Sequence, residues 1–185
     1  QYYSKFDLAK GYWQVPMRNQ DKGLTTFTTH RGLFQFNVMP FGLINAPATF
    51  SRIMRKLLDG SEKLYNYLDD VLAAAECWNV HLRVLRDLFN RVRNGRLAIR
   101  PSKCSVGYNT VKFLGYNVSY NGLRPALDTV DKLQRAPRPE TKTQLRSFMG
   151  LVGFYRRFVP SFAQVAVALT DLTRKGAPNK LCWEA

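Results

Sequence analysis

Three aspartates in this sequence have the spacing and the surroundings of a metal site. Asp69 and Asp70 are adjacent, and Asp7 ends an alternating apolar and polar run that begins at Tyr2. Adjacent carboxylates repel each other and are costly to bury unless a cation neutralises them, and hard oxygen ligands suit Mg²⁺. The simpler alternative is a pair of turn aspartates in a solvated loop. Apolar residues on both sides of the pair favour the metal site, because they indicate a buried hairpin with the carboxylates at its tip.

One reaction would suit such a site. Two Mg²⁺ ions about 3.5 to 4 Å apart can activate an attacking 3′-hydroxyl and stabilise a leaving pyrophosphate in an in-line phosphoryl transfer. Mn²⁺ is a possible substitute for Mg²⁺.

The charge of the chain indicates that it binds a polyanion. Its 185 residues include 28 Lys and Arg against 13 Asp and Glu, for a net charge of +15. Residues 1–77 hold 9 basic and 7 acidic residues, whereas residues 78–185 hold 19 and 6. The first part is thus better suited to carboxylate chemistry and the second to contacts with phosphates. A membrane-surface protein is disfavoured, because the sequence lacks a basic amphipathic helix with a continuous apolar face.

Composition and cysteine usage narrow the setting further. Hydrophobic residues make up 45% of the chain, which is typical of a folded protein. Cys77, Cys104 and Cys182 are odd in number and lack CxxC spacing, so neither a disulfide framework nor a zinc site is predicted. The longest apolar stretches fall well short of the ~18 residues that a membrane span needs. We therefore expect a soluble protein of a reducing, intracellular compartment.

The elements that must position the aspartates belong to an α+β domain. Period-two alternation and β-branched or aromatic residues predict strands, and apolar residues at helical spacing predict helices. Asn45 can cap a helix with Pro47 in its first turn, and Asp69 and Asp70 are expected at the turn of a tight hairpin. The expected elements are strands at 2–8, 24–29, 33–38, 64–68 and 71–74 and helices at 45–60 and 80–92.

The last third of the chain has a different character. A strand at 111–120 is expected to turn at Asn121-Gly122. Thr141 and Gln144 form a capping box that predicts a helix ending before Pro160. One more helix is expected at 162–172, and the domain boundary near Leu123 to Asp128. The intervening linker is marked by Pro125, Pro137 and Pro139.

Several sequence motifs together resemble those of a known family. In order and spacing they resemble the motifs of reverse transcriptases, in the form typical of Gypsy-type LTR retrotransposons, and the resemblance covers essentially the whole chain. Tyr67-Leu68-Asp69-Asp70 is similar to the YxDD motif of that family. The other motifs are Phe6–Gln14 (FDLAKGYWQ), Met39–Pro47 (MPFGLINAP), Lys112–Tyr116 (KFLGY) and Leu151–Phe158 (LVGFYRRF).

The resemblance implies a domain plan. Residues 1–124 would form a polymerase palm, an antiparallel sheet with packed helices and partial fingers. Residues 125–175 would form a helical thumb-like or connection segment, and residues 176–185 the start of a linker to a ribonuclease H-like domain. The chain is then expected to be a piece of a Pol polyprotein that lacks its upstream fingers strands. The remaining parts of that polyprotein would include protease, ribonuclease H and integrase.

The resemblance also implies roles at the metal site. Asp7 and Asp69 would each bind both metal ions, and Asp70 would support them. The backbone carbonyl of Leu8 would complete the ion on the nucleotide side. The substrates would be dNTPs and a primer on an RNA or DNA template.

Further residues would contact the substrates. Tyr12 would be a steric gate against a 2′-hydroxyl, with a core aromatic as the alternative, and Phe41 with Gly42 would lie under the nucleotide. Leu68 would touch the primer end or the sugar. Lys103 would lie near the triphosphate, with a solvated surface lysine as an equal alternative. Primer and template contacts would come from Tyr67, Phe113, Leu114, Gly115, Arg156 and Arg157, where the arginine pair has a solvated alternative.

Two functions of different classes follow. The first is an RNA-directed DNA polymerase fragment, expected in a cytoplasmic virus-like particle. The second is a catalytically inactive retroelement remnant that only binds nucleic acid. Intact aspartates at all three motif positions favour the polymerase.

Overall fold

A computed structural model describes residues 1–183 of the chain. The chain divides into two compact units, each described here by itself. Unit 1 comprises Gln1–Phe113 with Val118–Gly122, and unit 2 comprises Leu114–Asn117 and the residues from Leu123 onward. Glu184 and Ala185, which belong to the expected linker, lie outside the described residues.

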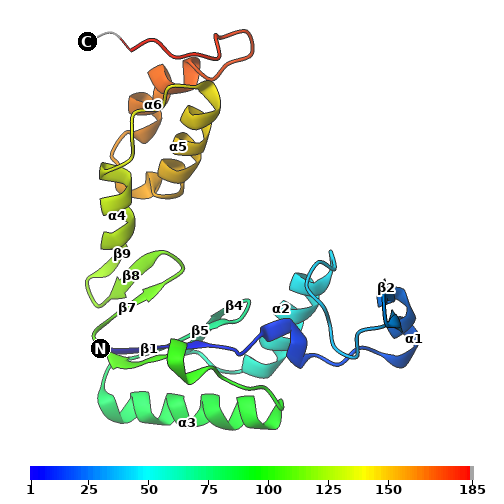
Figure 1. Ribbon diagram of the computed structural model, residues 1–185. Coiled ribbons are helices and arrows are strands. Elements are labelled where there is room, and N and C mark those ends of the chain that lie inside the picture. Colours follow the sequence, from blue (N-terminus) through cyan, green and yellow to red (C-terminus); the bar gives the residue numbers. More distant parts are fainter. Residues whose placement is uncertain (184–185) are drawn as a thin grey trace. The chain divides into compact units, whose positions relative to one another are not determined.

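Unit 1 is built on a four-stranded antiparallel sheet. Its order is β4-β5-β1-β6, so the first strand lies in the interior of the sheet (Figure 1). Asp7 and Asp70 are register partners at one end of the β1–β5 pair, and Tyr2 and Ala75 are partners at the other end. The strands are β1 (Tyr2–Asp7), β4 (Leu64–Tyr67), β5 (Asp70–Ala75) and β6 (Ser105–Tyr108).

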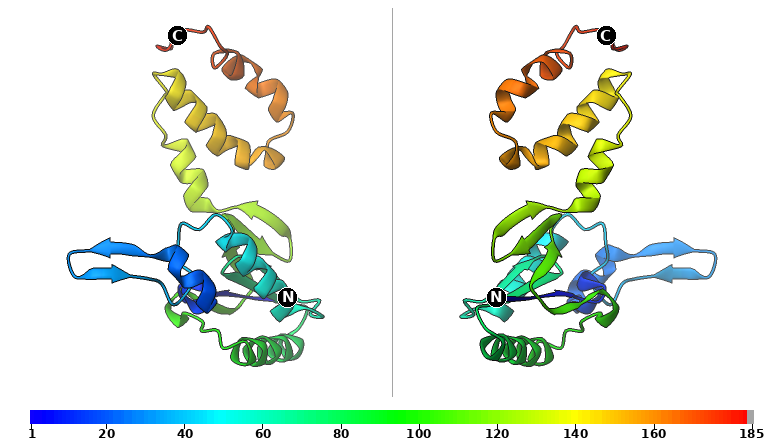
Figure 2. Two further views of the ribbon diagram at one scale, coloured as in Figure 1. Left: turned by 90° about the vertical axis from the view of Figure 1, so that its right-hand side faces the viewer. Right: turned by 90° about the vertical axis from the view of Figure 1, so that its left-hand side faces the viewer.

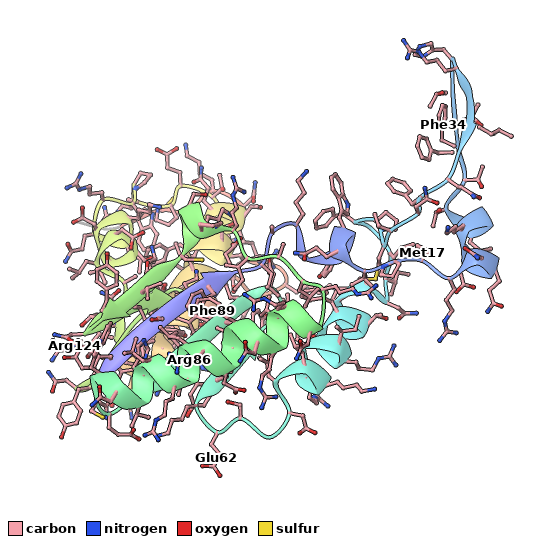
Figure 3. All side chains as sticks on the ribbon, turned by 90° about the horizontal axis from the view of Figure 1, so that it is seen from below. Met17, Phe34, Glu62, Arg86, Phe89 and Arg124 are labelled. Carbon is pink, nitrogen blue, oxygen red and sulfur yellow. The ribbon has the colours of Figure 1, made fainter. Side chains whose placement is uncertain are left out.

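Two amphipathic helices cover one side of this sheet. Helices α2 (Ala46–Leu58) and α3 (Trp78–Asn94) contribute Phe50, Met54, Leu85 and Leu88 to the core of unit 1, and each of these side chains is buried. Figure 3 looks onto α3 with β1 behind it. We call the covered side the helical face. Its strand residues in the core are Phe6, Leu8, Leu64, Val71 and Ala73.

The alternate residues of β1 and β5 point to the opposite side of the sheet, since neighbouring side chains of a strand alternate. We call this side the carboxylate face. Its residues are Tyr3, Lys5 and Asp7 of β1 and their register partners Ala74, Leu72 and Asp70 of β5. Tyr3 and Leu72 are buried there in a smaller apolar cluster with Val111.

A hairpin and a short helix follow β1. The hairpin pairs β2 (Phe27–Thr29) with β3 (Gly32–Phe34), and α1 spans Asn19–Lys22. Figure 2 shows this hairpin, in blue, projecting from the rest of unit 1. The predicted hairpin is confirmed, but its strands are shorter than expected, because residues 23–25 form a 3-10 turn.

Three strands of the C-terminal half form a separate sheet of order β7-β8-β9. They are β7 (Thr110–Phe113), β8 (Tyr116–Ser119) and β9 (Gly122–Pro125). The predicted β structure at 111–120 is present, but as two strands, and the turn between them was not predicted from the residue pattern. Leu114 and Gly115, with φ of 50° and 83°, form this turn. Strand β6 was not predicted either, and its Gly107 has a φ of 75° that few other residues adopt.

Unit 2 contains three helices, α4 (Leu127–Gln134), α5 (Lys142–Phe154) and α6 (Phe162–Asp171). Both halves of the predicted capping box are present, since Thr141 accepts a hydrogen bond from the Gln144 N–H and the Gln144 side chain accepts one from the Thr141 N–H. α5 and α6 lie side by side (Figure 2). The predicted linker at 125–139 is wrong in part, because α4 lies within it.

The α+β class is confirmed by these elements. In the described part of the chain, no helix is both long enough and apolar enough to cross a membrane.

Candidate active site

The ends of two neighbouring strands bring the aspartates together. Asp7 is the last residue of β1 and Asp70 the first residue of β5, and the two are register partners. Directly opposed residues of an antiparallel pair point to the same side of the sheet. Asp69 precedes Asp70 in the β4–β5 turn, and its carbonyl accepts the Leu8 N–H at 2.9 Å. This bond ties the turn to the end of β1.

The β4–β5 turn has a strained residue next to the aspartates. Tyr67 and Asp70 pair across the hairpin, which leaves Leu68 and Asp69 as a two-residue turn. Leu68 has a φ of 53°, in the left-handed region that costs an L residue about 1–2 kcal/mol. The expected hairpin is confirmed, but Asp70 lies in the strand rather than in the turn, so its side chain has a fixed direction.

Two lysines contact the carboxylates. Lys103 Nζ lies 3.5 Å from Asp7 Oδ2, with the Lys103 side chain 54% exposed and that of Asp7 16% exposed. Lys5 Nζ lies 3.1 Å from Asp70 Oδ1, and both side chains are about three-quarters covered. Lys103 was predicted near the triphosphate, with a solvated surface lysine as the alternative, and the structure places its ammonium group beside Asp7. Lys5 was missed, although its place two residues before Asp7 on a strand indicates the same face.

The donor set of this end of the sheet consists of hard oxygens, which fit Mg²⁺ or Mn²⁺ better than softer metals. Asp69 is exposed, whereas Asp7 and Asp70 are partly covered. Within residues 1–183, no three His, Cys, Asp or Glu side chains converge closely enough to form a metal cluster. The arrangement therefore offers a carboxylate pair, Asp7 and Asp70, with Asp69 on the adjoining turn.

The aromatic residues predicted for the nucleotide site lie together. Tyr12 lies in a 3-10 helix at Gly11–Gln14. The centroid of its ring is 5.2 Å from that of Phe41 and 5.5 Å from that of Phe50. Phe41 is 61% exposed, and Gly42 has a φ of 95° that favours glycine. Tyr12 is half-buried and packs against the core, as its core alternative expected, and its role as a gate stays a prediction.

Gly11 is a site residue that the sequence argument missed. A Cβ atom at this position would lie 3.3 Å from Asp69 Cβ and 3.3 Å from Phe50 Cζ, which is tighter than most such contacts. The absence of a side chain here lets the Tyr12 segment approach the β4–β5 turn. A glycine immediately before the aromatic pair Tyr12-Trp13 was the available indication.

A buried polar link holds β1 from the helical face. Ser4 Oγ lies 2.6 Å from His81 Nε2 and accepts the Gly107 N–H at 2.9 Å, so it joins α3, β1 and β6. His81 Nδ1 is buried and has no hydrogen-bond partner among the described residues. Burial lowers the pKa of His81, because the charged imidazolium would lose its hydration.

The residues predicted to hold the primer and template lie apart in the chain. Tyr67 is exposed beside the β4–β5 turn, and Phe113 packs in the cluster with Tyr3 and Val111. In unit 2, the carbonyl of Gly115, next to Leu114 in the β7–β8 turn, accepts the Tyr155 hydroxyl at 3.1 Å. The arginine pair was expected on a helix, but Arg156 and Arg157 lie exposed in a 3-10 turn after α5.

The sequence of this chain is similar to one protein family and to several known proteins. Residues 1–118 match the model of the reverse transcriptase (RNA-dependent DNA polymerase) family. The chain is 33% identical to the retrovirus-related Pol polyprotein from transposon 297 of Drosophila melanogaster, over 95% of this chain and 17% of that protein. It is 30% identical to the transposon Tf2-3 polyprotein of Schizosaccharomyces pombe, over 94% of this chain and 13% of that protein. The chain thus spans less than a fifth of these relatives.

Solved structures give the same result for the fold. A foamy viral protease-reverse transcriptase in complex with double-stranded DNA superposes with a TM-score of 0.92 and 28% identity, over 100% of this chain and 32% of that chain. The foamy viral enzyme in complex with an RNA/DNA hybrid superposes with a TM-score of 0.90 and 28% identity, over 100% and 25%. The predicted palm-like α+β fold is confirmed by this likeness. On the family match and on these relatives, the chain belongs to the reverse transcriptase family.

Proposed function

We propose that this chain is the catalytic palm and the following helical segment of an RNA-directed DNA polymerase. It would add dNTPs to the 3′-hydroxyl of a primer on an RNA or DNA template. The observation that carries this proposal is the pairing of Asp7 with Asp70 at the end of β1, next to an Asp69 whose carbonyl accepts the Leu8 N–H. The proposal includes residues 1–124 as palm with partial fingers, 125–175 as thumb-like segment and 176–185 as linker.

The site residues would divide the work of binding metal. Asp7 and Asp69 would hold two Mg²⁺ or Mn²⁺ ions, with Asp70 in support and the Leu8 carbonyl as a further ligand. Such ions, when bound, supply Lewis acidity and charge neutralisation to phosphoryl transfer. The oxygen donors of the described site fit that role, and the exposed position of Asp69 leaves its carboxylate accessible.

The protein's own groups would orient the nucleotide and handle its proton. The Tyr12 ring, backed by Phe50, would face the sugar and exclude a 2′-hydroxyl. Phe41 and Gly42 would lie under the base pair, and Leu68 would contact the primer end. Lys103, 3.5 Å from Asp7, can donate a proton to a pyrophosphate that leaves beside that aspartate.

The nucleic acid would extend beyond the palm. Foamy viral relatives of this fold are described in complex with double-stranded DNA and with an RNA/DNA hybrid. By analogy, Tyr67, Phe113, Leu114 and Gly115 would hold the primer strand, and Arg156 with Arg157 would meet phosphates. We further propose a Gypsy-type element, a Pol polyprotein with protease, ribonuclease H and integrase, and a cytoplasmic virus-like particle as the setting.

Primer extension tests the polymerase. The chain, joined at its N-terminus to the fingers segment of a retrotransposon relative, is given primed RNA or DNA template, dNTPs and Mg²⁺ or Mn²⁺. We expect metal-dependent extension that Asp69→Asn abolishes. Asp59→Asn, an exposed aspartate at the end of α2, is the matched control and should extend normally. Equal extension by the Asp69→Asn variant would sink the proposal.

A nucleic-acid-binding remnant is the second candidate. The observation that favours it is that Lys5 and Lys103 each contact a carboxylate of the site, so the charge is partly balanced within the chain. This candidate predicts salt-sensitive duplex binding that stays the same when Asp7, Asp69 and Asp70 are substituted. No polymerisation would then occur even with the fingers segment supplied.

A further inference from the structure

Lys5 is a charged residue of the carboxylate face to which the proposed function gives no role. It shares this face with Asp7, two residues along the same strand. Its register partner across the sheet is Leu72, and Asp70 lies on the diagonal, opposite Asp7. The ammonium group of Lys5 reaches along this diagonal to within 3.1 Å of Asp70 Oδ1.

The two lysine contacts of the site differ in how firmly they are held. Lys5 extends from the middle of an interior strand, and its side chain and that of Asp70 are 25% and 24% exposed. Lys103 ends a short 3-10 helix at Pro101–Lys103, is 54% exposed and lies at 3.5 Å from its carboxylate. Solvent screens a covered pair less than an exposed one. Lys5 is therefore the more covered and more closely paired of the two positive charges at the site.

We propose that Lys5 is a positioning residue that holds the Asp70 carboxylate and sets how tightly the aspartates bind a divalent cation. This proposal rests on the proposed function of the aspartates as metal ligands. The ammonium group offsets the repulsion between two carboxylates that face each other across the strands. The same positive charge repels a divalent cation, so its removal is expected to strengthen binding of the cation.

Metal binding gives the first test. Mn²⁺ affinity is measured by electron paramagnetic resonance on the 185-residue chain, without nucleotide or nucleic acid. We expect Lys5→Met to bind Mn²⁺ about three- to tenfold more tightly than the wild type. Lys5→Arg, which keeps the charge, should bind like the wild type. Unchanged or weaker binding by Lys5→Met would overturn the proposal.

A matched control separates the site from the general charge of the protein. Lys63 pairs with Glu76 in the same unit, and both side chains of that pair are more exposed than Lys5 and Asp70. Lys63→Met removes the same charge from unit 1 and should leave Mn²⁺ affinity within about twofold of the wild type. An equal gain in Lys63→Met and Lys5→Met would show a long-range charge effect and overturn the proposal.

A double-mutant cycle gives the second test, which needs no metal. Thermal unfolding in EDTA is compared for the wild type, Lys5→Met, Asp70→Asn and the double variant. We expect Lys5→Met to lower the Tm by about 2 to 4 °C, and to have no effect once Asp70 is neutral. A loss of the same size in both backgrounds would mean that only the aliphatic stem of Lys5 matters. If Lys5→Met does not fold, folding of the double variant supports the pairing and its failure to fold overturns it.

These readouts stay distinct from the polymerase test. Neither uses dNTPs, primer or template, so a chain that does not extend primers can still show the Lys5 effects. A chain that extends primers with the Lys5→Met affinity unchanged would instead keep the proposed function and lose the role of Lys5.

Discussion

The two faces of the four-stranded sheet share the same strands but differ in chemistry. On the helical face, Phe6 and Val71 are almost fully buried against α2 and α3. On the carboxylate face, the register partners Asp7 and Asp70 each contact a lysine and remain partly exposed. The helical face holds the larger apolar core of unit 1, and the carboxylate face uses the rigidity of the same strands to hold charges that would otherwise repel one another. Alternation along β1 and β5 produces both.

Part of the excess positive charge can be assigned to one side of this sheet. Residues 78–113 hold eight Lys and Arg against one Asp. Arg83, Arg86 and Arg93 of α3 are exposed, and α3 covers the helical face. These arginines therefore lie on the opposite side of the sheet from Asp7 and Asp70. We expected the positive charges of residues 78–185 to contact phosphates. The position of α3 gives no support to that expectation for its own arginines.

The largest expected effect comes from removing a charge on the carboxylate face. Asp7→Asn should lower primer extension on the order of 10³-fold, because a lost metal ligand removes several kcal/mol of transition-state stabilisation. Its unfolding free energy should stay near the wild-type value, since a repelling charge is lost with the lysine contact. Primer extension and urea unfolding of the same variant check both. Loss of activity together with loss of the folded state would erase the contrast between the faces.

The helical face should show the reverse behaviour. Phe50→Ala removes a side chain with 0% exposure and should cost about 3–5 kcal/mol of unfolding free energy. Urea denaturation monitored by circular dichroism measures this cost. Phe34→Ala, on the projecting hairpin labelled in Figure 3, is the matched control and should change stability by about 0.5 kcal/mol or less. Equal costs at the two positions would contradict the assignment of the core.

The buried imidazole of the helical face predicts a pH dependence. Burial lowers the pKa of His81, so the folded protein favours the neutral ring. The contribution of His81 to stability is then fully present above the unfolded pKa of about 6.5 and is lost as the pH falls below it toward the folded pKa. The slope is at most about 1.4 kcal/mol per pH unit.

Unfolding between pH 7.5 and 5.5 measures this dependence. His81→Gln should remove this pH dependence. His30→Gln, at the other histidine of the chain, which is exposed, should leave the dependence unchanged. A wild-type stability that stays constant over this interval, or the same slope in His81→Gln, would be inconsistent with a buried neutral ring.

The sequence predicted the helical face better than the carboxylate face. Apolar periodicity marks α2, α3 and the strands directly, and the Thr141 capping box located the start of α5. Lys5 was missed because its partner Asp70 is set by the register of β1 on β5, which no local pattern encodes. The predicted Asn45 cap makes no side-chain hydrogen bond, since its backbone is already in the helical region. Helix α4 was missed because the prolines around it indicated only a linker.

The smallest expected effect is at Leu68, in the β4–β5 turn. Its φ of 53° is strained for any residue with a Cβ atom, so Leu68→Gly should be about 1 kcal/mol more stable than Leu68→Ala. Urea unfolding of the pair measures the difference, which also cancels the loss of the leucine side chain. At Ala48, exposed in α2, alanine should be more stable than glycine by about 1 kcal/mol. The same order at both positions would mean that the turn relaxes out of the left-handed region, and that Asp69 is held less firmly against β1 than its bond to Leu8 indicates.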